Sequence, residues 1–123
     1  GAVAFDGTNF ALASSTGGSG LMPPGRVGDV PYRGCGFEIG PEGAVLATGV
    51  GEEIIRRQGS WQVFRKIAAL SVEHVTHAGM ICQAVAESWP PDLDVGFIAI
   101  TRQWIGMGAN CKMANAFHCA QKE

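Results

Sequence analysis

The sequence lacks long apolar runs, an excess of basic residues and closely paired cysteines. Its longest apolar runs, such as residues 95–100, are about six residues, whereas a membrane-spanning helix needs about 20. Lys and Arg number 9 against 11 Asp and Glu, a balance that excludes a basic nucleic-acid binder and a polybasic membrane module. We therefore expect a soluble domain that binds neither nucleic acid nor a membrane. The compartment stays open.

The four cysteines form no C-x-x-C pair, which argues against a zinc ribbon or a thioredoxin-like site. They are also too few for a disulfide scaffold. Cys111 and Cys119 would face each other if a hairpin turned near Asn115, and a disulfide is one interpretation of that pair. Buried free thiols are the alternative.

The start of the chain shows no Met and no signal peptide, and residues 1–5 already have a strand pattern. A strand at the first residue leads us to expect that something upstream has been lost, by trimming or by proteolysis.

One domain is expected from 123 residues of which 46% are hydrophobic. Strands are predicted at 3–5 and 10–15, joined as a hairpin with both faces buried, and at 44–48, 95–100, 105–109 and 116–120. One helix should start at Glu52 and run to about Val72 with Trp61 and Phe64 on its apolar face, and a second should span 77–88. This order favours an α+β fold, an antiparallel sheet with helices on one face.

A glycine- and proline-rich loop over residues 14–31 carries Arg26 and Asp29, three residues apart. Long loops in compact domains are often functional. A guanidinium suits a carboxylate and an aspartate suits an ammonium, so the pair would fit the zwitterionic end of an amino acid. The alternative is an Arg26–Asp29 salt bridge that only stiffens the loop.

The segment Thr48-Gly49-Val50-Gly51-Glu52 follows a buried strand. Backbone N–H groups in such a glycine turn form a ready site for an oxyanion, and a tight turn without a ligand is the alternative. His74 and His77 have a spacing that could chelate a metal, but without a third ligand surface histidines are favoured. The three tryptophans are interpreted as core or interface residues.

Five motifs in order carry a resemblance over nearly the whole chain: Gly1-Ala2-Val3-Ala4, Ser15-Thr16-Gly17-Gly18, Gly25-Arg26-Val27-Gly28-Asp29, Gly34-Cys35-Gly36 and Thr48-Gly49-Val50-Gly51-Glu52. Together they resemble the β-subunit of glycosylasparaginases and of the related isoaspartyl peptidase/plant-type L-asparaginases. The resemblance implies an N-terminal-nucleophile hydrolase with an αββα sandwich, residues 1–123 supplying the β-subunit half. It also implies an α-subunit from the same precursor, (αβ)2 assembly, and no metal or cofactor.

In that family a precursor cuts itself, and the freed N-terminal threonine is the nucleophile with its own α-amine as base. Gly1 matches the third residue of such a start, so the threonine is expected two positions earlier. By resemblance, Thr16 lies beside the nucleophile, Arg26 binds the substrate α-carboxylate, and Asp29 binds the α-ammonium with help from the Gly51 carbonyl. Thr48 and Gly49 would form the oxyanion hole.

Three departures from the family pattern flank this site: Val30 replaces a serine, Val50 a histidine, and Met22 stands where a lysine is common. They put the leaving group in doubt more than the chemistry. Residues 96–99 and 108–112 favour glycosylasparaginase over isoaspartyl peptidase. A non-catalytic binder and an endopeptidase, which Gly34-Cys35-Gly36 resembles, stay open.

Overall fold

The computed structural model describes residues 1–70 and 78–120. Its helices and strands follow in the order β1 (Ala2–Phe5), β2 (Phe10–Ala13), β3 (Phe37–Gly40), β4 (Gly43–Gly49), α1 (Gly51–Arg57), α2 (Gly59–Ala68), α3 (Ala78–Glu87), β5 (Val95–Thr101) and β6 (Ile105–Ala109). The predicted α+β class is confirmed.

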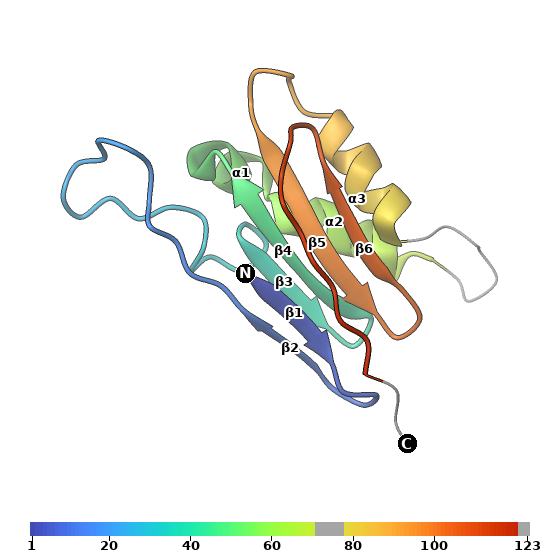
Figure 1. Ribbon diagram of the computed structural model, residues 1–123. Coiled ribbons are helices and arrows are strands. Elements are labelled where there is room, and N and C mark those ends of the chain that lie inside the picture. The colour runs from blue at the N-terminus through green and yellow to red at the C-terminus, as the bar shows by residue number, and fades with distance from the viewer. Residues whose placement is uncertain (71–77, 121–123) are drawn as a thin grey trace.

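The main sheet is antiparallel and has the strand order β3-β4-β5-β6. Its central strands pair Val45 with Ala99 and Ala47 with Phe97, and these side chains share one face because strand side chains alternate. That face packs against α2 and α3, which lie behind the sheet in Figure 1. The buried core therefore lies between the helices and the sheet. Within the described residues no helix has the length and apolarity to cross a membrane.

The predicted hairpin is present, with Val3 opposite Leu12 and Phe5 opposite Phe10. It packs through β1 and β2 on the face of the main sheet that the helices leave open (Figure 1). The prediction that both of its faces are buried is wrong for this chain: the large side chains are half-buried, and the alanines of the other face are exposed. The hairpin thus forms part of a second β-layer whose outer face is uncovered here.

The single helix predicted after Glu52 is divided in two at Gln58, which has a φ of 52°. The N–H groups of Ser60 and Trp61 donate to the Cys35 and Gly34 carbonyls (3.0 and 2.9 Å), so tertiary hydrogen bonds replace helical ones. Phe64 is buried as predicted, but Trp61 is 43% exposed. Val72 lies outside the described residues.

The strands predicted at 95–100 and 105–109 are confirmed, but none forms at 116–120. The Asn110 side chain accepts from Val95 N–H (2.8 Å) and donates to the Leu93 carbonyl (2.9 Å), which turns the chain at the sheet edge. The following segment crosses in front of the sheet without pairing (Figure 1). All four cysteines are free thiols: Cys35 and Cys82 are buried, whereas Cys111 and Cys119 are not, so no Cys111–Cys119 disulfide forms.

Candidate active site

The loop that carries Arg26 and Asp29 is fixed at its end by backbone hydrogen bonds to the Asp29 carbonyl. The Asp29 carbonyl accepts hydrogen bonds from Tyr32 N–H (2.9 Å) and Gly36 N–H (3.1 Å). A Cβ at Gly36 would lie 2.5 Å from the same carbonyl oxygen, so only glycine permits this close approach. The Gly34-Cys35-Gly36 motif therefore sets the position of Asp29 on the sheet.

Arg26, Asp29 and Gly51 lie close together in the structure, although Gly51 follows Asp29 by 22 residues in the sequence. A Cβ at Gly51 would lie 2.8 Å from Arg26 Nη2 and 2.9 Å from Asp29 Oδ1. A cation and an anion thus flank the first residue of α1, which carries no side chain of its own. The structure thus brings both charged groups to the start of α1.

Asp29 is 6% exposed, and among the described residues nothing hydrogen-bonds its Oδ2. Burial raises the pKa of this carboxyl; its own backbone N–H and Arg26 lower it, and Glu52 raises it further. A buried carboxylate oxygen without a partner is costly, on the order of 1–3 kcal/mol or more for a charged group. A cationic group brought beside this oxygen would offset that cost.

Arg26 forms its salt bridge with Glu52. The alternative drawn from the sequence, an Arg26–Asp29 salt bridge that only stiffens the loop, is therefore wrong. Its Nε and Nη2 donate to Glu52 Oε1 at 2.8 and 2.6 Å. The Arg26 side chain is 14% exposed, and Glu52 is 64% exposed. This hydrogen bond lowers the pKa of Glu52. From the sequence, Glu52 was interpreted only as an acidic residue that favours the start of a helix. Its pairing with Arg26 was missed. The position of Glu52 directly after Gly51, the glycine that contacts the loop, could have indicated it.

Thr48 and Gly49 end β4 and are exposed. Ala47 N–H donates to the Gly36 carbonyl (2.9 Å), and strand alternation directs Gly49 N–H out of the same edge of β4. Gly49 has a φ of 144°, and a Cβ there would lie 2.1 Å from the Asp94 carbonyl oxygen. Val50 N–H is already used by the same oxygen (3.1 Å). Of the amides of Gly49 and Val50, the structure thus leaves that of Gly49 as a candidate donor and excludes that of Val50.

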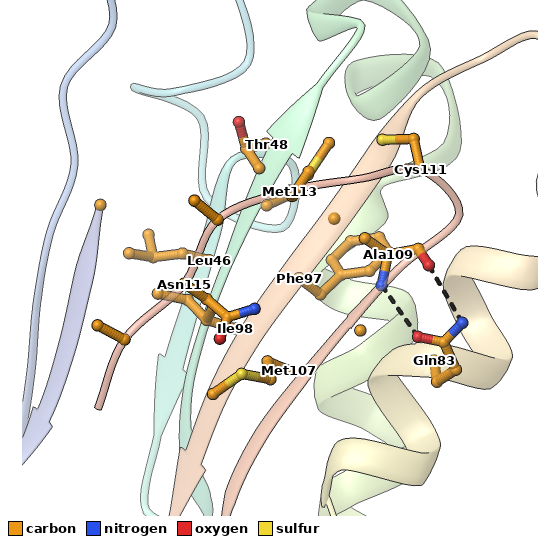
Figure 2. A pocket seen from close by; sticks show the side chains of 16 residues that line it. Leu46, Thr48, Gln83, Phe97, Ile98, Met107, Ala109, Cys111, Met113 and Asn115 are labelled. Atoms are coloured by element: carbon orange, nitrogen blue, oxygen red, sulfur yellow. Dashed lines mark hydrogen bonds between the residues drawn. The ribbon is translucent and has the colours of Figure 1, made fainter. Parts of the chain in front are cut away.

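A cleft of about 530 Å³ is lined by both Gly1 and Thr48. It lies between the open face of the main sheet and the C-terminal segment, whose Asn115 lies near Ile98 and whose Met113 lies near Thr48 in Figure 2. At one rim Gln83 exchanges two hydrogen bonds with the Ala109 backbone, both 3.1 Å. Gly1, immediately before β1, and Thr48, near the end of β4 and one of the predicted oxyanion donors, therefore line the same cleft.

Thr16 lies in the exposed part of the loop, where its hydroxyl accepts a hydrogen bond from Gly18 N–H (2.9 Å). The oxygen keeps its proton to donate elsewhere. Its predicted place beside the nucleophile stays a prediction. His74 and His77 lie outside the described residues, and the described part of the chain contains no group of three potential metal ligands. Trp89 is buried, whereas Trp61 and Trp104 are about two-fifths exposed.

The fold and site together define an α+β chain with two β-layers, one helix layer, and an arginine and an aspartate beside the first residue of α1. Comparison with known proteins then identifies its family. The family model described as Asparaginase matches residues 1–123, so the chain belongs to the asparaginase family.

Individual relatives are similar over part of the chain. A plant-type L-asparaginase of Pyrobaculum calidifontis is 60% identical over 58 residues, 45% of this chain and 19% of the relative. An isoaspartyl peptidase of Escherichia coli is 45% identical over 65 residues, 51% and 20% of the two chains. A probable isoaspartyl peptidase/L-asparaginase of Drosophila pseudoobscura is 37% identical over 89 residues, 71% and 25%. The matched regions span about a fifth to a quarter of these relatives.

Proposed function

We propose that this chain supplies the substrate clamp and the oxyanion donors of an amidohydrolase that cleaves the β-amide bond of asparagine or of β-aspartyl peptides. The observation that carries the proposal is the buried Asp29 carboxylate, whose Oδ2 has no partner among the described residues, beside Arg26 and Gly51. Asp29 takes the substrate α-ammonium and Arg26 its α-carboxylate. The β-amide then projects from this clamp toward the end of β4.

The nucleophile in this proposal is the hydroxyl of a threonine two positions before Gly1 in the longer protein. Its α-amine takes the hydroxyl proton as the oxygen attacks the β-carbonyl carbon. The carbonyl oxygen becomes an oxyanion, which the Thr48 hydroxyl and Gly49 N–H stabilise. The proton passes to the leaving amine, the C–N bond breaks, and a β-aspartyl ester remains. Water hydrolyses the ester and releases L-aspartate.

For the leaving group we propose ammonia or an amino acid. The names of the relatives, L-asparaginase and isoaspartyl peptidase, support this choice. Residues 96–99 and 108–112 favour the alternative, a glycosylamine. Six of them line part of the cleft that Thr48 also lines: Gly96, Phe97, Ile98, Gly108, Ala109 and Cys111. An α-subunit would complete this pocket. The preference for a leaving group must therefore be measured on the whole protein.

The test uses the full-length protein with L-asparagine, a β-aspartyl dipeptide and N4-(N-acetylglucosaminyl)-asparagine, and measures released L-aspartate. We expect release from the first two, and a new chain that begins with threonine two residues before Gly1. Release only from the third substrate would move the assignment to glycosylasparaginase. No release, with no threonine at that position, would favour a non-catalytic binder.

Arg26→Lys tests the clamp itself. A lysine cannot make the two-point contact with a carboxylate, so kcat/KM should fall about 10- to 100-fold, the worth of a hydrogen bond to a charged group. The melting temperature should change little. Arg56→Lys is the matched control, since Arg56 pairs with Glu53 at the same 2.6 Å on the exposed side of α1. Unchanged kcat/KM in Arg26→Lys would refute the assigned role.

A further inference from the structure

The ion pair between Arg26 and Glu52 joins the substrate loop to the first turn of α1. We propose that Glu52 is a positioning residue, which holds the Arg26 guanidinium in the orientation that receives the substrate α-carboxylate. The proposal rests on the proposed function, because it assumes that Arg26 binds that carboxylate. Glu52 itself touches no reacting atom.

The pair with Glu52 uses only one edge of the Arg26 guanidinium. Both hydrogen bonds to Glu52 Oε1 come from one edge of the guanidinium, through Nε and Nη2. A guanidinium carries five N–H donors, so Nη1 and the second hydrogen of Nη2 are left on the end edge for a two-point carboxylate contact. Glu52 therefore holds the group without occupying the donors that the substrate requires.

The surroundings of Arg26 explain why it needs such an anchor. The guanidinium lies between two glycines: a Cβ at Gly28 would lie 2.7 Å from Nη1, and a Cβ at Gly51 would lie 2.8 Å from Nη2. Glycines make room for the group but provide no side chain to pack against it. Arg26 also sits on a loop without regular secondary structure. Its orientation is therefore set by a polar contact, and Glu52 provides it.

The neighbouring Glu53 separates this role from ordinary helix stabilisation. Both glutamates stand in the first turn of α1 and carry the same charge. Glu53 pairs within the helix, with Arg56 at 2.6 Å and Arg57 at 3.2 Å. Glu52 instead reaches across 26 residues to the loop. Its charge also raises the pKa of Asp29, so it works against the ionised form of the ammonium-binding group. The benefit of Glu52 must therefore lie in the orientation of Arg26.

The experiment compares two substrates in the full-length protein: L-asparagine and 3-aminopropanamide, which is the same molecule without the α-carboxylate. For Glu52→Ala we expect kcat/KM for L-asparagine to fall about tenfold, since misplacement of a binding group by a fraction of an ångström has this order of effect. The value for 3-aminopropanamide should stay within about twofold, because that substrate makes no carboxylate contact. The affinity for L-aspartate, measured by calorimetry, should fall in parallel.

Two further variants separate orientation from charge and from helix stability. Glu52→Gln keeps an oxygen that accepts from Arg26, so it should recover most of the activity lost in Glu52→Ala. Glu53→Ala should leave both substrates unchanged, although it removes the same charge from the same helical turn.

Three results would overturn the proposal: equal losses on both substrates, no loss on L-asparagine, or tighter binding of L-aspartate by Glu52→Ala. The last would mean that Glu52 competes with the substrate for Arg26. A wild-type protein that neither hydrolyses L-asparagine and β-aspartyl dipeptides nor binds L-aspartate would end the proposed function and this inference together. An active wild type with an unaffected Glu52→Ala ends the inference alone.

Discussion

Replacing Gly51 by alanine should damage substrate binding far more than stability. The added Cβ would lie 2.8 Å from Arg26 Nη2 and 2.9 Å from Asp29 Oδ1, whereas ordinary contacts begin at 3.4 Å. Both charged groups must therefore retreat by about half an ångström or leave their positions. Misplacement on the order of 1 Å typically costs about 100-fold in rate, so we expect kcat/KM for L-asparagine to fall between about tenfold and 100-fold.

The stability of the Gly51→Ala variant should rise slightly or stay unchanged, although its activity falls. Gly51 has no left-handed backbone conformation, and it is the first residue of α1. Alanine at a compatible position stabilises by about 0.4–1 kcal/mol, which offsets the local crowding. Gly20→Ala is the control, because nothing lies within 4 Å of its Cβ position in the same loop. A melting temperature that collapses together with activity, or a kcat/KM equal to that of Gly20→Ala, would refute the clamp geometry.

Two more predictions concern Asp29 and Thr48. Because burial raises the pKa of Asp29 above its ordinary 3.8, the folded protein holds this proton more tightly, and stability falls as pH rises through the raised pKa. Asp29→Asn should therefore raise the melting temperature at pH 7, with the gain vanishing below pH 3.8, while L-aspartate binding is lost; a lower melting temperature at pH 7 would contradict this. Thr48→Val keeps the shape and removes the hydroxyl, so kcat should fall about 100-fold with the melting temperature unchanged, and a fall below threefold would remove Thr48 from the oxyanion hole.

The main sheet and its helix face follow from local patterns. Continuous apolar runs at residues 44–48 and 95–100 indicated buried strands, and the glycines and prolines between them marked the loops. The break at Gln58 did not follow, because the hydrogen bonds that cause it come from Gly34 and Cys35, distant in sequence. The strand predicted at 116–120 failed for a related reason: the segment crosses the open face of the sheet and does not run beside one of its edge strands, so its backbone has no strand to pair with.

The chemistry of the candidate site could be predicted from the sequence, but its geometry could not. The residue types of Arg26 and Asp29 indicated the ligand chemistry, and the glycine turn before α1 indicated close backbone approach. The partner of Arg26 did not follow from the sequence, since spacing favoured Asp29 three residues away and only the folded loop brings Glu52 within 2.6 Å. Burial of Asp29 was equally invisible, because it depends on the turn that ends at Gly36.

The central claim is that Arg26 and Asp29 together bind the two charged ends of an amino acid. Calorimetry on the full-length protein can test it directly with three ligands. L-Aspartate carries both charged groups, succinate lacks the α-ammonium, and β-alanine lacks the α-carboxylate. We expect L-aspartate to bind at least about tenfold more tightly than either of the others, because each of those lacks one charge-assisted contact. Equal affinity for all three ligands, or binding of L-aspartate that Asp29→Asn leaves unchanged, would contradict it.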